Sequence, residues 1–323
     1  MRVLNLMIGI LLIVVTLNAQ NHSNIEAVMD EGPGRYQVLI DQDDTIKIPF
    51  KMHNGKPLME IEINGAKANL MIDNGVLWEQ VWLFGSPLVD VLQLKPIDSK
   101  SISGSENESS THLYESKNLT LKFNDIIFYE QPVLVSPTAA GFARMFPDAD
   151  GQLCNTFFKH FIVEFDFIEN EIILHNPKGF IYNGKGSTLD MQLTETGTYS
   201  VPFIITTNDG KVYKDRADID LGGIYPFKVA LNTSLDIKAP TGSKKRDAFG
   251  GTEYFAKIDN MTIGDYTFEH VNVVFGDEKT ARVHPKNIGM IGLPMFMKFN
   301  IIFDYFNNII YIEPNENFNK PFN

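Results

Sequence analysis

Two short segments of the chain carry the residues best suited to chemistry, and both have the pattern Asp-x-Gly. Asp73-Asn74-Gly75 ends the stretch 58–75, and Asp220-Leu221-Gly222-Gly223 ends the stretch 200–223; each stretch consists of two apolar runs joined by a turn signal. A single Asp-x-Gly is a common turn, in which the carboxylate simply caps the backbone. Two in the same context indicate a duplicated unit with one carboxylate in each copy.

Asp73 and Asp220 would lie side by side if the two copies pack about a twofold axis. Two adjacent carboxylates cannot both ionise cheaply, so the pair shares one proton over an intermediate pH range. The ionised member can activate a water as a base, while the protonated member donates to a carbonyl, and a proton later passes to the leaving amine. The glycine in each segment lets backbone N–H groups approach the carboxylates closely. This chemistry is amide hydrolysis, and it requires no metal and no cofactor.

A second repeat supports the duplication. The segment GQLCNTFFKHFIVEFDFIENEIIL (151–174) aligns without gaps with GMIGLPMFMKFNIIFDYFNNIIYI (289–312). Two copies of a unit this long are unlike a solenoid, whose repeats are shorter, and too few for a propeller. The chain is therefore expected to contain two similar lobes.

The elements that must position these residues are mostly β-strands. From Tyr36 onward, short runs rich in Ile, Val, Phe and Tyr alternate with turn signals such as Asn64-Gly65, which is typical of antiparallel β proteins. Short helices are expected only near 139–146, 155–160 and 293–298. We predict an all-β fold, a pseudo-twofold pair of β-barrel lobes with a few short helices. The expected divisions are an N-terminal lead-in at 20–45, an N-terminal lobe at 46–183 and a C-terminal lobe at 184–323.

The first 19 residues have the pattern of a secretory signal peptide, with Arg2, an apolar stretch from Val3 to Leu17, and a cleavage site after Ala19. The alternative is an uncleaved membrane anchor, but the apolar stretch is shorter than the ~20 residues that a span needs. No cysteine follows it for lipid attachment. We expect a secreted, periplasmic or cell-envelope protein with no membrane span after cleavage.

Composition argues against several classes of function. The 28 Lys and Arg against 40 Asp and Glu give a net charge of −12, so nucleic acid is not an expected partner. One cysteine, Cys154, excludes an internal disulfide or a Cys-based zinc site, and the seven histidines lack metal-binding spacing. Cys154 with His160 is an alternative thiol nucleophile, although a buried structural thiol is favoured.

With these motifs the chain resembles the pepsin-like and retropepsin-like aspartic peptidases, particularly secreted bacterial two-lobed aspartyl protease-like proteins. The resemblance covers residues 58–177 and 200–314. It implies a pepsin-like acid-protease fold, Asp73 and Asp220 as the catalytic pair, and an extended peptide or protein substrate in the cleft between the lobes. It also implies active-site loops made by Asn74, Gly75, Leu221, Gly222 and Gly223, supported by the triplets Gln152-Leu153-Cys154 and Met290-Ile291-Gly292, in which Leu153, Cys154, Ile291 and Gly292 lie nearest the loops.

The chain departs from the family pattern at three positions of the site. The family has Thr or Ser after each Asp, whose hydroxyl fixes the opposite loop; Asn74 keeps a polar group there, but Leu221 has none. Cys154 replaces a glycine at a close approach, where it is expected to push the backbone apart or force a local rearrangement. The polar run 101–110 resembles the tip of a flap, without a clear flap tyrosine.

Three functions remain open from the sequence. The first is a secreted aspartic endopeptidase that hydrolyses peptide bonds with a water activated between two Asp carboxylates, and both Asp and both Gly favour it. The second is a catalytically inactive, peptide-binding pseudoprotease that retains the cleft, and Leu221 and Cys154 favour it. The third is a cell-envelope structural protein.

Overall fold

The computed structural model describes residues 36–38, 45–75, 81–94, 98–101, 112–135, 146–194, 197–231, 235–248, 251–277 and 288–322. Within these ranges the chain is almost entirely β, with three short helices, α1 (Pro87–Val91), α3 (Thr156–His160) and α4 (Leu293–Phe296). The predicted all-β class is confirmed. The expected signal peptide, residues 102–110 of the expected flap tip and residues 139–145 of an expected helix lie outside the described residues. No helix in the described part is long and apolar enough to cross a bilayer.

Six strands of the first lobe close into a barrel in the order β9-β6-β10-β5-β4-β8, with β8 pairing back onto β9. They are β4 (Lys56–Ile63), β5 (Ala66–Ile72), β6 (Val81–Leu83), β8 (His112–Phe123), β9 (Ile126–Val135) and β10 (Gly151–Leu153), and β1 (Tyr36–Val38), β3 (Lys51–His53) and β7 (Asp98–Ser101) pair at their edges. Asn64 and Gly65 join β4 to β5 with φ of 49° and 81°, as expected for an Asn-Gly hairpin turn.

The second lobe repeats this barrel in the order β15-β16-β21-β17-β20-β19, closed by a pairing of β15 with β19. Its strands are β15 (Tyr199–Thr206), β16 (Val212–Asp220), β17 (Phe227–Ala230), β19 (Gly251–Ile263), β20 (Tyr266–Gly276) and β21 (Gly289–Gly292), extended by β14 (Gln192–Leu193) and β18 (Lys244–Ala248). In both lobes the short strand of the repeat, β10 or β21, runs parallel to the strand that leads to the Asp. The predicted duplication is therefore present in the strand pairing.

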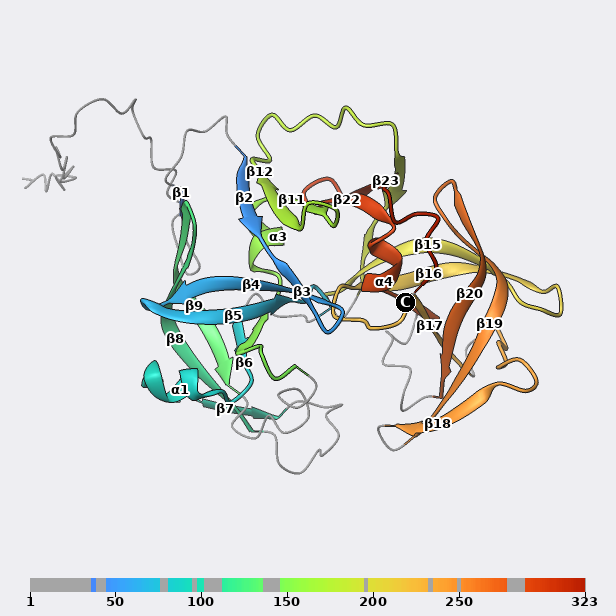
Figure 1. Ribbon diagram of the computed structural model, residues 1–323, viewed down its shortest axis with the longest axis horizontal. Helices are drawn as coiled ribbons and strands as arrows, with labels where there is room; N and C mark the ends of the chain where they lie inside the picture. The colour runs from blue at the N-terminus through green and yellow to red at the C-terminus, as the bar shows by residue number, and fades with distance from the viewer. Residues whose placement is uncertain are drawn as a thin grey trace, which may run out of the picture.

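A six-stranded sheet joins the lobes in the order β13-β23-β22-β11-β12-β2. It contains β2 (Ile46–Pro49), β11 (Ile162–Asp166), β12 (Glu171–His175), β13 (Ser187–Asp190), β22 (Phe299–Asp304) and β23 (Ile309–Pro314). At its centre, Val163 lies opposite Phe303 and Phe165 opposite Ile301. Because the repeat equates Val163 with Ile301 and Phe165 with Phe303, this register is that of a local twofold axis. Figure 1 shows the first barrel at the left of the view and the second at the right.

The apolar core is continuous through both barrels and the shared sheet. At the junction of the lobes, the Phe158 ring stacks on Tyr305 with centroids 5.0 Å apart and meets the edge of Phe303 at 5.4 Å. Such aromatic pairs contribute beyond their buried area. This packing fixes Tyr305, whose hydroxyl reaches one of the Asp-x-Gly loops.

Candidate active site

The two Asp-x-Gly segments meet between the lobes. Asp73 follows β5 directly and Asp220 is the last residue of β16, and these strands occupy equivalent places in the two barrels. Each aspartate alters the pKa of the other, so the two carboxyl groups lie close together, and both residues are of intermediate burial. Two carboxyl groups this close do not both ionise easily, so the pair can share one proton. The structure therefore brings the two predicted carboxylates together.

Each segment's glycine lies against the carboxylate of the other segment. A Cβ atom on Gly75 would lie 2.7 Å from Asp220 Oδ1, and one on Gly222 would overlap Asp73 Oδ2. The backbone N–H of Gly75 donates to Asp73 Oδ1 at 3.0 Å, and that of Gly223 donates to the backbone carbonyl of Asp220 at 3.0 Å. The backbone N–H groups of Gly222 and Gly223 lower the pKa of the Asp220 carboxyl group. The glycines thus allow the carboxyl groups to approach, and their amides favour the ionised forms.

Burial raises the pKa of both members of the pair. Desolvation, followed by the negative charge of Asp220, raises the pKa of Asp73 to about 7. Desolvation also raises the pKa of Asp220, but the charge of Lys56 opposes that increase. The shared proton therefore belongs to the pair, which titrates as a unit.

Asn74 connects its own loop to the other lobe. Its side chain is buried, and its Oδ1 accepts a hydrogen bond from the backbone N–H of Leu221 at 2.9 Å. Its Nδ2 donates to the hydroxyl of Tyr305 at 3.1 Å. Asn74 therefore supplies one half of the cross-lobe contact that the resemblance assigns to hydroxyl residues. The Leu221 side chain is fully buried in the apolar core and supplies none.

Lys56 makes a second contact between the first lobe and the Leu221 loop, and the sequence analysis did not predict it. It is the first residue of β4 and is 2% exposed, and its Nζ donates to the backbone carbonyls of Leu221, at 3.3 Å, and Gly222. Burial lowers the pKa of Lys56, and the charges of Asp220 and Asp73 raise it. The one sequence signal is a lysine directly after the Asn54-Gly55 turn, and that position is also common for an exposed strand end.

The residues of the two supporting triplets lie beside the two loops. The Leu153 carbonyl accepts the backbone N–H of Asp73 at 3.0 Å, and Ile291 and Gly292 pair with Ile219 and Asp220 in β16. A Cβ on Gly292 would overlap the carbonyl of Tyr225, so that position does require glycine.

Cys154 stands at the equivalent position of the first lobe, where a side chain was expected to push the backbone apart or force a local rearrangement. The pairing of β10 with β5 ends at Leu153, whereas that of β21 with β16 continues through Gly292, and the Cys154 side chain is fully buried. Burial, and then the charge of Asp73, raises the pKa of the thiol, so it stays protonated. His160 is also buried, packed on Tyr36 with ring centroids 4.9 Å apart. The open Cys-His site required for a thiol mechanism is therefore not formed.

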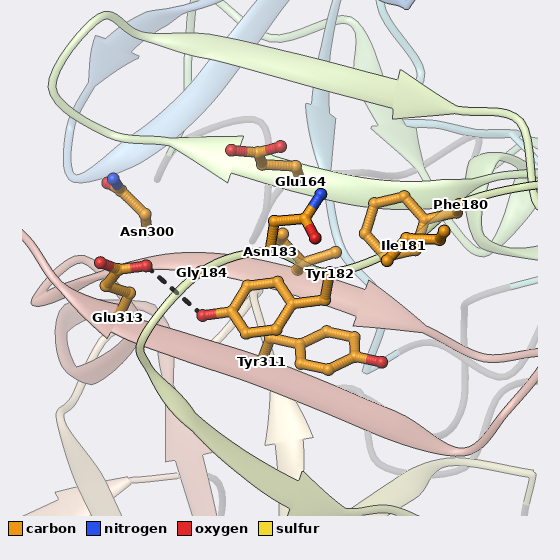
Figure 2. A pocket seen from close by; sticks show the side chains of 10 residues that line it. Glu164, Phe180, Ile181, Tyr182, Asn183, Gly184, Asn300, Tyr311 and Glu313 are labelled. Carbon is orange, nitrogen blue, oxygen red and sulfur yellow. Dashed lines mark hydrogen bonds between the residues drawn. The ribbon is translucent and has the colours of Figure 1, made fainter.

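A separate cavity of about 250 Å³ lies between the shared sheet and the chain segment 180–184. Figure 2 shows Tyr182 over Tyr311, with centroids 4.2 Å apart, and Tyr182 donating to Glu313 at 3.4 Å. Neither Asp73 nor Asp220 lines this cavity. The described residues contain no cluster of three or more His, Cys, Asp or Glu that could hold a metal ion.

The sequence matches no protein-family model and no curated protein sequence. Among solved structures, the crystal structure of an aspartic proteinase from Irpex lacteus is similar to this chain with a TM-score of 0.55 and 14% identity. The match covers 87% of this chain and 100% of that one. Together with the two closed six-stranded barrels, it shows that the chain has the pepsin-like two-lobed fold.

Proposed function

We propose that this protein is an aspartic-type endopeptidase in which Asp73 and Asp220 hydrolyse peptide bonds. The observation that carries the proposal is the close approach of the two Asp-x-Gly segments at the junction of the lobes, in which the glycine of each segment lies against the carboxyl group of the other. Both aspartates are of intermediate burial, and we propose that water and a substrate carbonyl reach them between the lobes. The likeness of the fold to an aspartic proteinase agrees with this function.

In the proposed reaction, ionised Asp220 removes a proton from a water molecule, whose oxygen attacks the substrate carbonyl carbon. Protonated Asp73 donates its proton to the carbonyl oxygen, which gives a neutral tetrahedral diol. Asp220 then passes its proton to the amide nitrogen as the C–N bond breaks, and Asp73 recovers a proton from a diol hydroxyl. The products are a carboxylic acid and an amine, and the pair returns to its initial state without a metal or a cofactor.

The substrate that suits this arrangement is an extended peptide bound between the lobes. An extended chain can pair its main chain with neighbouring strands, and side-chain pockets then select the sequence. We propose that such a peptide places its scissile carbonyl against the Asp73–Asp220 pair.

A second candidate is a peptide-binding protein without catalytic activity. Leu221 in place of a hydroxyl residue is the observation that favours it, because the reciprocal contact between the loops is lost. Against it stand the hydrogen bonds of Asn74 and Lys56 to the Leu221 backbone, which hold the second loop by other means.

The decisive experiment is digestion of a mixed peptide library by the purified protein from acid to neutral pH. D73N and D220N are the test variants, and D209N, which changes an exposed carboxylate on the β15–β16 turn, is the matched control. Cleavage by the wild type and D209N that is lost in both folded test variants supports the peptidase. Peptides that are retained but not cleaved support the second candidate, and a protein that neither cleaves nor binds peptides overturns both.

We also propose that the protein is exported after removal of residues 1–19. Expression in a secreting host followed by N-terminal sequencing tests this. A mature chain that begins at Gln20 supports export, and an intact N-terminus on an anchored protein contradicts it.

A further inference from the structure

A buried cation faces the carboxyl pair. Lys56 comes from the first lobe, yet its ammonium group donates to carbonyls of the second lobe, those of Leu221 and Gly222. Burying an ammonium group is costly unless it is hydrogen-bonded and its charge is compensated. The carbonyls supply the hydrogen bonds, but they carry no net charge. The negative charges that act on Lys56 are those of Asp220 and Asp73.

Two other buried lysines of the described residues differ from Lys56 in their partners. Lys228 makes a direct ion pair with Glu253 at 2.8 Å. Lys298 is 4% exposed and donates to backbone carbonyls of the C-terminal segment, including that of Asn317 at 3.0 Å. Lys298 is thus a structural, carbonyl-bound lysine. Lys56 has the same kind of carbonyl contacts but faces a carboxyl pair as well.

The loop that Lys56 holds is the one that lacks a polar side chain. Asn74 accepts the N–H of Leu221, and Lys56 donates to the C=O of the same residue. Both contacts come from the first lobe, so they fix the second-lobe loop from one side. Lys56 therefore adds a second contact that holds the Asp220 loop, which has no polar side chain of its own at position 221.

We propose that Lys56 is a positioning residue of the active site that holds the Asp220 loop and, as a buried ammonium ion, keeps the carboxyl pair singly ionised at acidic pH. This inference rests on the proposed function and deepens it. A nearby cation favours the ionised form of a carboxyl group. In agreement, the charge of Lys56 lowers the pKa of both Asp73 and Asp220, against the effect of burial.

Among the described residues, the other titratable groups near the pair do not supply this charge. Cys154, next to β10, has its pKa raised by burial and then by Asp73, so the thiol stays neutral. Tyr305, on the far side of Asn74, also has its pKa raised by burial. In the part of the site that the structure describes, the charge balance is therefore set by Asp73, Asp220 and Lys56.

The test is the pH profile of kcat/KM for K56M, K56R and the control K298M. In K56M the pKa of both carboxyl groups rises, so both limbs of the bell-shaped profile move to higher pH, by about one pH unit. K56R keeps the charge and leaves the limbs in place, although the altered side chain lowers kcat. K298M leaves the profile unchanged. A folded K56M whose limbs do not move overturns the proposal, whatever its kcat, because loss of a merely structural contact lowers the rate without shifting the limbs.

A direct titration separates this inference from the proposed function. The protein is labelled with [γ-¹³C]aspartate, the Asp73 and Asp220 signals are assigned with D73N and D220N, and their pH dependence is recorded by NMR in wild type and K56M. Titrations that move to higher pH in K56M support the role of Lys56 even if no peptide is cleaved. Unmoved titrations overturn it even if the wild type is an active peptidase. Should K56M not fold, K56Q, which keeps an amide donor without a charge, provides the same comparison.

Discussion

The side-chain Oδ1 of Asn74 accepts a hydrogen bond of 2.9 Å from the backbone N–H of Leu221, and this contact joins the two lobes directly beneath the carboxyl pair. The same side chain donates to Tyr305, which packs against Phe158. One amide thus connects both active-site loops to the aromatic core between the lobes. The position of Asp220 relative to Asp73 therefore depends on a residue that does no chemistry itself.

Replacement of Asn74 by Ala is expected to reduce activity more than stability. It leaves the Leu221 N–H and the Tyr305 hydroxyl without this partner, and each unsatisfied buried group costs about 1–3 kcal/mol. We expect a lower Tm together with a fall in kcat of about 100-fold, because small displacements of reacting groups are costly for rate. N74S, which keeps a side-chain oxygen acceptor, is the control and should retain more activity. An N74A enzyme with wild-type kcat would contradict this role.

Replacement of Gly222 by Ala is expected to separate the carboxyl groups. The new Cβ would overlap Asp73 Oδ2, so the side chain of Asp73 must move away from Asp220. Cleavage should be lost while circular dichroism still shows a folded β protein. G251A is the matched control, since its Cβ would overlap the carboxylate of Asp277 on the second barrel. Equal loss of activity in both variants would indicate a general effect on folding instead.

The sequence predicts the duplicated architecture well because its signals are local. The aligned segments 151–174 and 289–312 form the same order of strand, helix and two strands in both lobes, and each glycine of an Asp-x-Gly segment lies where a side chain would not fit. Turn residues and apolar alternation act over a few positions, so they can be read from one chain.

Lys56 was missed because its partner is distant in the sequence. It meets the carbonyl of a residue 165 positions away, and neither its type nor its neighbours indicate that partner. Helix α1 was missed because it has only five residues, and its signals are limited to the Ser86 side chain, which accepts the Leu88 N–H at 3.2 Å, and Pro87 in its first turn.

The raised pKa of Asp73 makes stability depend on pH. Asp73 ionises near pH 3.8 without its folded environment and near pH 7 within it. Between these values the folded protein holds more protons than the unfolded chain, so its stability falls as the pH rises, by at most about 1.4 kcal/mol per pH unit for this group. D73N lacks this titration. Urea unfolding at several pH values should therefore show D73N gaining stability relative to wild type from pH 4 toward pH 7, and a constant difference would contradict the shift.

The buried ion pair of the second barrel is expected to be sensitive to loss of one partner. Glu253 is 1% exposed and accepts hydrogen bonds from Lys228, at 2.8 Å, and from Arg246. Burial raises the pKa of Glu253, but these two partners outweigh it and hold that pKa below its usual value. E253Q breaks the buried ion pair with the Lys228 ammonium group, and removal of one partner of a buried pair costs about 3–5 kcal/mol.

Removal of Arg246, the half-exposed partner of Glu253, should destabilise the protein far less. R246A breaks a pair that water can screen, so it should cost only about 1 kcal/mol or less from the lost charge pair. The double variant K228M/E253L removes both buried charges and should recover most of the stability lost in E253Q, because well-packed apolar side chains can replace a buried ion pair. Denaturant unfolding of the three variants measures the free energy of unfolding of each and so ranks their stabilities. If E253Q is no less stable than R246A, the buried charge on Lys228 is compensated by another group, and the assignment of Glu253 as its partner is wrong.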